Sequence, residues 1–160
     1  MSADWFVVNA RDAQWFDTDL GKFCSFEREG ERFAQLGVNL NVLAPGEAMA
    51  MYHREDGQED FLVVDGECTL VVEGEERPLR TWDFFHCPPQ VAHVIVGAGD
   101  RPSLVLAVGS RAHGRGVFYP ADPVAQSHGA AAAADTADPK EAYTGHRLEK
   151  APYQEGWLPE

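Results

Sequence analysis

Apolar and polar residues alternate in the middle of this chain with the period of two that is typical of β-strands. Val38, Leu40 and Val42 alternate with Asn39 and Asn41. Further short apolar runs follow, each ended by a glycine or a proline: 61–64, 68–72, 83–87, 93–96 and 104–108. Short strands with turns at this density predict an all-β sandwich or barrel over residues 36–111.

The pair Asp65-Gly66 separates two of these runs. Asp-Gly between apolar runs is a strong hairpin signal, because the turn needs a positive φ. We therefore expect the runs 61–64 and 68–72 to pair as a β-hairpin.

The segments on either side of the barrel have a different character. Residues 1–35 are too aromatic for a disordered tail, and they predict an arm with one or two edge strands that covers the barrel or a neighbouring subunit. Residues 112–160 form a short helical or irregular extension, in which Asp122-Pro123 and Asp138-Pro139 match the N-cap and first-turn proline of helices. The prolines and aromatics of 151–159 leave two alternatives, a tail packed on the barrel and a disordered tail.

The net charge of −13 argues against anionic partners, so we expect neither nucleic acid nor a membrane surface as a partner. No apolar run reaches the roughly 18 residues of a membrane span. Residues 1–5 lack the basic start and apolar core of a secretory signal. Cys24, Cys68 and Cys87 include no Cys-x-x-Cys pair, which favours reduced thiols in a cytoplasmic protein.

Four imidazole and carboxylate side chains form the candidate site. His53 and Glu55 are two residues apart, so on a strand they point to the same face. Glu59 can return to that face after the turn at Asp56-Gly57, and His93 must come from another strand. Such side chains can converge on one metal ion if strands carry them.

These spacings resemble the cupin superfamily. The first cupin motif reads Gly-x5-His-x-His-x3,4-Glu-x6-Gly and the second reads Gly-x5-Pro-x-Gly-x2-His-x3-Asn. The matching stretches here are His53-x-Glu55-x3-Glu59-x6-Gly66 and Pro88-x4-His93. The gap from Gly66 to Trp82, which takes the first place of the second motif, fits the compact single-domain bacterial cupins of undefined activity. The resemblance implies a double-stranded antiparallel β-barrel, or jelly roll, often dimeric, with a metal inside.

The chain departs from both motifs. Glu55 stands where the family has its second metal histidine, and Glu47 stands at the first glycine. In the second motif, Trp82 and Gln90 replace glycines and Gly97 replaces the asparagine. Because turn glycines are structural, their loss predicts altered loop geometry.

By this resemblance a divalent metal would be held by His53, Glu55, Glu59 and His93. A nitrogen–oxygen set without thiolate suits Fe(II), Mn(II), Ni(II) or Zn(II). Glu55 is either a fourth ligand or a general base beside the metal. A metal-free polar pocket is the other explanation of the histidines.

The expected function is that of a metal-dependent enzyme of dioxygenase, isomerase or hydrolase type, acting on a small molecule as a homodimer. The alternative is a non-catalytic barrel that binds or senses a small molecule, with a structural metal or none. One barrel serves many reactions, so the resemblance predicts the fold far better than the chemistry.

Overall fold

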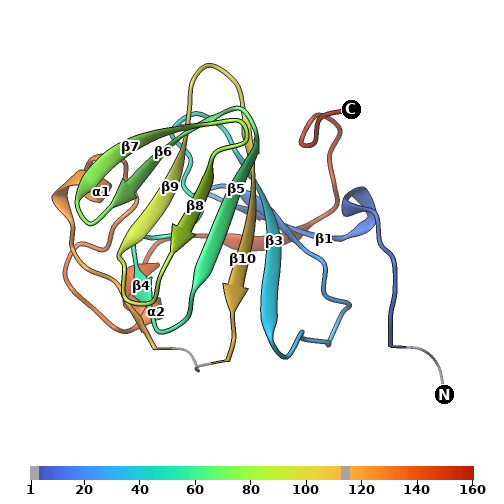
Figure 1. The fold of residues 1–160 in the computed structure, drawn as a ribbon, viewed down its shortest axis with the longest axis horizontal. Coiled ribbons are helices and arrows are strands. Elements are labelled where there is room, and N and C mark those ends of the chain that lie inside the picture. The colour runs from blue at the N-terminus through green and yellow to red at the C-terminus, as the bar shows by residue number, and fades with distance from the viewer. Residues whose placement is uncertain (1–3, 113–115) are drawn as a thin grey trace.

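The computed structural model describes residues 4–112 and 116–160, and antiparallel strands dominate its regular elements (Figure 1). In chain order these are η1 (Ala10–Asp12), β1 (Gln14–Thr18), β2 (Lys22–Ser25), β3 (Leu36–Leu43), β4 (Arg54–Glu55), β5 (Glu59–Asp65), β6 (Glu67–Val72), β7 (Glu75–Arg80), β8 (Phe84–Cys87), β9 (His93–Ala98), β10 (Ser103–Ser110), β11 (Val117–Phe118), α1 (Pro123–Ser127), α2 (Pro139–Ala142) and β12 (Leu148–Ala151). The expected all-β fold is confirmed.

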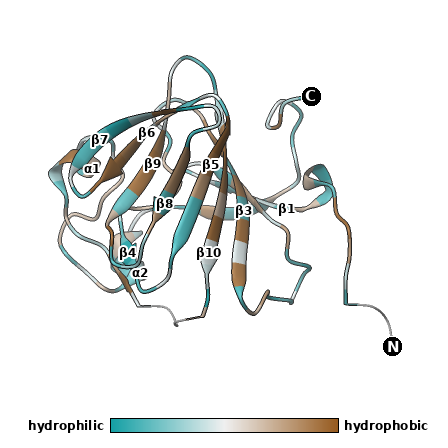
Figure 2. Cartoon of the chain, viewed as in Figure 1, coloured by the Kyte–Doolittle hydropathy of each residue, from teal (hydrophilic) through white to brown (hydrophobic). Residues whose placement is uncertain are grey.

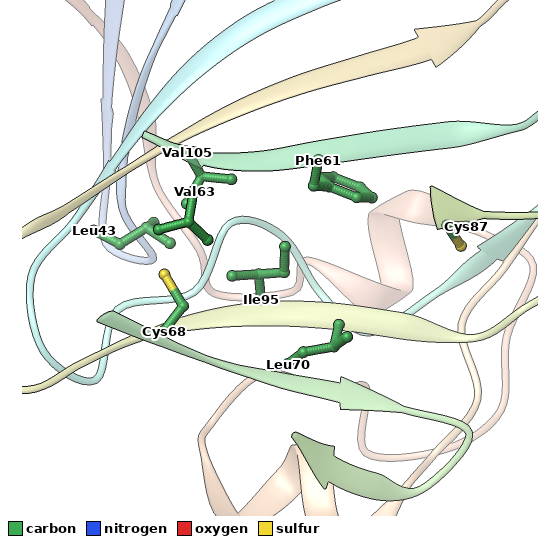
Figure 3. Packing of buried hydrophobic residues seen from close by; sticks show 8 residues of the cluster. All are labelled: Leu43, Phe61, Val63, Cys68, Leu70, Cys87, Ile95 and Val105. Atoms are coloured by element: carbon green, nitrogen blue, oxygen red, sulfur yellow. The ribbon is translucent and has the colours of Figure 1, made fainter. Parts of the chain in front are cut away.

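Two sheets face each other and form the jelly-roll barrel. The larger has the order β12-β1-β2-β3-β10-β5-β8, the smaller has the order β7-β6-β9, and a separate ladder joins β4 to β11. Figure 3 shows Phe61, Val63 and Val105 of the large sheet pointing toward Leu70 and Ile95 of the small one. All five are at most 4% exposed. Burying each such side chain stabilises the fold by about 1.5–3 kcal/mol, so this cluster holds the sheets together.

The barrel interior is apolar at one end and polar at the other. In Figure 2 the strand β5 changes from teal to brown along its length. On β3, Leu43 belongs to the core cluster, whereas Asn39 and Asn41 line cavities inside the barrel. Val42 belongs to a cluster on the outer face of the same sheet, and Leu40 packs against it. The polar positions of the alternating pattern therefore face inward here.

The hairpin expected at Asp65-Gly66 is wrong. The strand β5 pairs with β10 and β8, whereas β6 pairs with β7 and β9, so the chain passes from one sheet to the other here. Gly66 has a φ of +85°, and a Cβ on it would lie 2.8 Å from the Cα of Ser103. Glycine is required here because of its positive φ and this close approach. Neither requirement specifies which strands pair, so the Asp-Gly signal did not predict the pairing correctly.

The hairpin in this region joins β6 to β7, a strand that the apolar pattern does not reveal. Its turn consists of Glu73 and Gly74, with φ values of 49° and 76°. Two successive positive φ values fit the turn that matches the twist of paired strands. The strand β7 is largely exposed and polar and carries Pro78, as an edge strand tolerates.

Trp82 and Gln90, which replace motif glycines, have φ values of 74° and 68°. Both turns thus keep the left-handed backbone that favours glycine, at a cost of about 1–2 kcal/mol for a residue with a Cβ. The Trp82 side chain is 70% exposed and packs little in return, while its N–H donates to the Val63 carbonyl.

We expect Trp82→Gly to be more stable than Trp82→Ala by about 1 kcal/mol, because only glycine relieves the left-handed strain. Thermal unfolding of the two variants measures the difference. The same pair of substitutions at Arg77, an exposed strand residue, is the control. There the order should reverse, because glycine weakens an ordinary strand by about 0.5–1 kcal/mol relative to alanine. An alanine variant at 82 as stable as the glycine variant would contradict the assignment of strain.

The aromatic arm and the C-terminal tail extend and cover the large sheet. The strands β1 and β2 continue the sheet beyond β3, and β12 pairs with β1 at its edge. The Trp15 ring lies 5.8 Å from Tyr153 and 5.2 Å from Trp157, measured between ring centroids. In the structure these contacts place the C-terminal tail against the outer face of the large sheet.

The two short helices begin where their sequence signals place them. The Asp122 side chain accepts a hydrogen bond from the Ala125 N–H, and the Asp138 side chain accepts one from Lys140, each with a proline in the first turn. Over residues 4–112 and 116–160, no helix has the length and apolar character needed to cross a membrane.

Candidate metal centre

Three of the four predicted side chains meet at the polar end of the barrel. Glu59 begins β5, His93 begins β9, and His53 forms an isolated antiparallel bridge with His93. The Glu59 Oε2 atom lies 3.4 Å from His53 Nε2 and 3.0 Å from His93 Nε2. One ligand atom from each residue lies within 4.8 Å of the others.

Backbone carbonyls fix the direction of both imidazoles. His53 Nδ1 lies 2.8 Å from the Met51 carbonyl oxygen, and His93 Nδ1 lies 3.0 Å from that of Val91. A carbonyl can only accept, so each Nδ1 carries the proton and donates it. Each Nε2 is then turned toward Glu59, which is the arrangement in which a histidine ligates a metal.

Two atoms of this group are buried without a hydrogen bond. Among the described residues, Glu59 Oε2 and His93 Nε2 have no hydrogen-bond partner, although the two atoms lie 3.0 Å apart. A buried polar atom without a partner costs about 1–3 kcal/mol. A cation among the three side chains would satisfy both atoms, so the residues fit a divalent metal.

The cluster perturbs its own protonation. Burial opposes charge on His53, but Glu59 and the Met51 carbonyl outweigh it, and the pKa of His53 is raised. Burial also opposes ionisation of Glu59, yet the two imidazoles lower its pKa to about 2. Glu59 is therefore a carboxylate at neutral pH and attracts a cation.

Glu55 lies beside the three residues and not among them. It ends β4, and its Oε2 atom is 3.9 Å from His53 Nε2. Its side chain is 30% exposed, compared with 17% for Glu59. Burial, together with the negative charge of Glu59, raises the pKa of Glu55.

A cavity of about 730 Å³ opens above the cluster, and a smaller one of about 200 Å³ continues into the barrel. His53 and Glu59 line both cavities, and Glu55 lines only the outer one. Further lining residues that the sequence did not single out are Arg32, Asn39, Asn41, Arg111 and Tyr119. The alternating pattern of β3 could have predicted that Asn39 and Asn41 share one face of the sheet, and this face lines the cavities. Nothing local marks the arginines or the tyrosine.

Tyr119 brings the C-terminal extension into the site. Only 6% of it is exposed, and its ring centroid lies 6.0 Å from that of His53. Burial raises its pKa to about 12, with Tyr143 and Glu55 adding to the effect, so the hydroxyl keeps its proton. Among the described residues no side-chain hydrogen bond engages this hydroxyl.

Apolar groups close the inner side of the cluster. Phe61 and Phe85 pack on the His93 ring, with centroids 5.3 and 5.9 Å away. Cys87 Sγ lies 3.3 Å from His93 Nδ1, and burial raises the pKa of this thiol to about 12. Cys87 is therefore a neutral neighbour of His93. His86, on the same strand as Cys87, faces away and contacts Asp60 at 2.7 Å.

Comparison with known proteins gives a family match for the central segment of this chain. The family model described as a cupin domain matches residues 39–109, the segment that carries His53, Glu59 and His93. No curated protein matches the chain. The solved structures give many matches.

One similar solved structure is a sugar phosphate isomerase from a cupin superfamily, from Silicibacter pomeroyi. It is 27% identical, with a TM-score of 0.58, over 64% of this chain and 67% of that one. An RmlC-like cupin from Shewanella frigidimarina is 19% identical, with a TM-score of 0.58, over 71% and 96% of the two chains. The polyketide cyclase RemF from Streptomyces resistomycificus is 14% identical, with a TM-score of 0.61, over 77% and 92%. The last two likenesses concern the fold alone. Residues 39–109 of this chain thus match the cupin domain, and the chain has the jelly-roll fold of a compact single-domain cupin.

Proposed function

We propose that this protein is a metal-dependent enzyme that acts on a small molecule by isomerase-type proton transfer. The metal site would consist of His53, Glu59 and His93, with Glu55 as the acid–base group. The observation that carries the proposal is the convergence of the three ligand atoms within 4.8 Å, with two of them buried and unsatisfied.

Two histidines and one carboxylate leave coordination positions open for a substrate. Fe(II), Mn(II), Ni(II) and Zn(II) all suit this donor set. When bound, such an ion supplies Lewis acidity, which polarises a carbonyl or hydroxyl oxygen of the substrate.

The protein's own groups supply proton transfer and orientation. Glu55 borders the cavity beside His53, so it can remove a proton from a hydroxyl-bearing carbon next to a carbonyl and return it to the carbonyl carbon, while the hydroxyl proton passes to the former carbonyl oxygen. The Tyr119 hydroxyl keeps its proton and can donate a hydrogen bond to a substrate oxygen. Phe61 and Phe85 restrict water at the inner side of the cluster.

Isomerisation is preferred to oxygenation or hydrolysis for two reasons. Glu55 provides a carboxylate outside the ligand cluster, as proton shuttling requires. The neighbour from Silicibacter pomeroyi, the more similar of the three in sequence, is described as a sugar phosphate isomerase. The test is solvent deuterium incorporation into glucose 6-phosphate and ribose 5-phosphate, followed by NMR.

The metal site itself is tested by elemental analysis of protein purified without an affinity tag. We expect near-stoichiometric iron, manganese, nickel or zinc in the wild type, and loss of the metal in a His53→Ala, His93→Ala double variant. His86→Ala is the matched control, because this histidine faces away from the barrel interior and contacts Asp60. An equal metal content in wild type and double variant would contradict the assignment.

Metal binding without deuterium incorporation into any tested substrate would favour the alternative, a cupin that binds or senses a small molecule. The homodimer and the cytoplasmic location stay predictions. Light scattering of the purified protein tests the first, and fractionation of the source cells tests the second.

A further inference from the structure

The outer cavity combines the candidate metal cluster with two arginines. Arg111 and Arg32 line the same space as His53, Glu55 and Glu59. In a chain with a net charge of −13, cationic groups are in the minority, and two of them face this cavity. Their position therefore bears on which molecules the cavity admits.

Arg111 is held in place from one side only. Its Nη1 atom donates to the Glu27 carboxylate and, at 2.6 Å, to the Phe33 carbonyl. Its Nε and Nη2 atoms have no hydrogen-bond partner in residues 4–112 and 116–160. The guanidinium is thus fixed in orientation and keeps N–H groups for a ligand, as a planar fork that matches an oxyanion requires.

Two glycines connect Arg111 to the metal cluster. Gly109 of β10 pairs with Glu59 of β5 on one side and with Gly37 of β3 on the other. Because neither glycine has a side chain, the cavity stays open over these two residues, between Glu59 on β5 and Arg111. A Cβ on Gly37 would lie 3.2 Å from Nη2 and 3.4 Å from Nε of Arg111, so this part of the guanidinium lies over Gly37.

Arg111 lies two residues beyond Gly109, a step of about 7 Å along an extended chain. A small molecule lying over Gly37 and Gly109 would therefore have Arg111 at one end and Glu59 with its histidines at the other. Arg32 adds a second cation from the loop between β2 and β3. Its side chain is exposed and has no ion-pair partner among the described residues.

We propose that Arg111, assisted by Arg32, anchors a phosphate or carboxylate group of the substrate, while the reacting carbon reaches His53, Glu59, His93 and Glu55. This inference rests on the proposed isomerase function, because the bound anion is a substrate only if the protein is an enzyme. The two arginines determine specificity, and they take no part in the proton transfer. Neutral polyols of similar size would lack this anchor and would bind more weakly.

Isothermal titration of the metal-loaded protein with inorganic phosphate, propionate and glycerol tests the anchor. The same titrations of the His53→Ala, His93→Ala variant remove any contribution of a bound metal. We expect phosphate, propionate or both to bind in each case, with no measurable binding of glycerol. Stronger binding of phosphate would identify a phosphate substrate, and stronger binding of propionate a carboxylate. Absence of binding by both anions would overturn the proposal.

Three variants identify the residues involved. Arg111→Met should weaken anion binding at least tenfold, as expected for loss of charge-assisted hydrogen bonds. Arg32→Gln should weaken it a few-fold. Arg28→Gln is the matched control, because Arg28 lies on the same loop but pairs with Glu31 and does not line the cavity. Unchanged affinity in Arg111→Met would overturn the assignment.

Arg111 also ties Glu27 and Phe33 to the barrel, so its loss can loosen that loop. Gly37→Ala serves as the second variant, since it keeps Arg111 and displaces its Nη2 edge. It should also weaken anion binding with an unchanged melting temperature, and unchanged affinity would count against the proposal. Metal content is measured separately. If the protein binds anions but no metal, the proposed metal-dependent enzyme is refuted and the anion site at Arg111 is retained. If it binds metal but no anions, the anion site is refuted and the proposed enzyme is retained.

Discussion

Replacing Glu55 with glutamine is expected to lower kcat by about 100-fold or more, the contribution typical of a positioned general acid–base group. Glutamine keeps the shape of the side chain but cannot accept a proton from carbon. Metal content should stay at the wild-type level, because Glu55 lies outside the group of three converging ligand atoms. The measurements are kcat on a substrate that exchanges solvent deuterium, and elemental analysis of the same preparation.

Asp60→Asn is the matched control for this substitution. Asp60 adjoins Glu59 on β5 but contacts His86 outside the barrel interior. This variant removes a carboxylate from the same strand and should change neither kcat nor metal content. A Glu55→Gln protein that loses its metal would identify Glu55 as a fourth ligand, and one with wild-type kcat would remove Glu55 from the mechanism.

Replacing Trp15 with alanine is expected to lower the free energy of unfolding by about 3–5 kcal/mol, as for other buried aromatic side chains. Trp15 is fully buried, and its indole N–H donates to the Ala10 carbonyl at 2.8 Å. It also packs against Tyr153 and Trp157, so its loss removes the surface on which the C-terminal tail rests. Urea unfolding followed by circular dichroism measures the change.

Trp5→Ala is the control, since Trp5 is 76% exposed and its loss should change stability by no more than about 0.5 kcal/mol. Release of the tail is checked independently by trypsin, because Lys150 lies in β12, just before the packed tail. Cleavage after Lys150 should become faster in Trp15→Ala and stay unchanged in Trp5→Ala. Equal losses of stability in the two variants would mean that the tail does not depend on Trp15.

The candidate metal site shows how well the spacing of residues in the sequence predicts which side chains meet in the structure. The site was predicted to contain four residues, His53, Glu55, Glu59 and His93, and the structure brings three of them, His53, Glu59 and His93, within 4.8 Å of one another. Glu55 was grouped with the other three because it lies two residues after His53 and takes the place of the second metal histidine of the motif. It lies on the two-residue strand β4, whose pairing with β11 places it at the cavity wall. Pairing with a segment from the C-terminal extension has no local signature near residue 55.

By itself, the sequence determined the all-β class, most strands of the barrel, the two capped helices and a group of four candidate metal-binding residues, of which three converge in the structure. These features depend on local rules, such as side-chain alternation, turn residues, N-caps and fixed motif spacing. Only the tertiary structure decided that the chain passes from one sheet to the other at Gly66. It also decided that Asn39 and Asn41 face inward and that Arg111 and Tyr119 line the cavity. Those outcomes depend on which strands pair and which face is covered. These are contacts between residues far apart in the chain, and local sequence does not specify them.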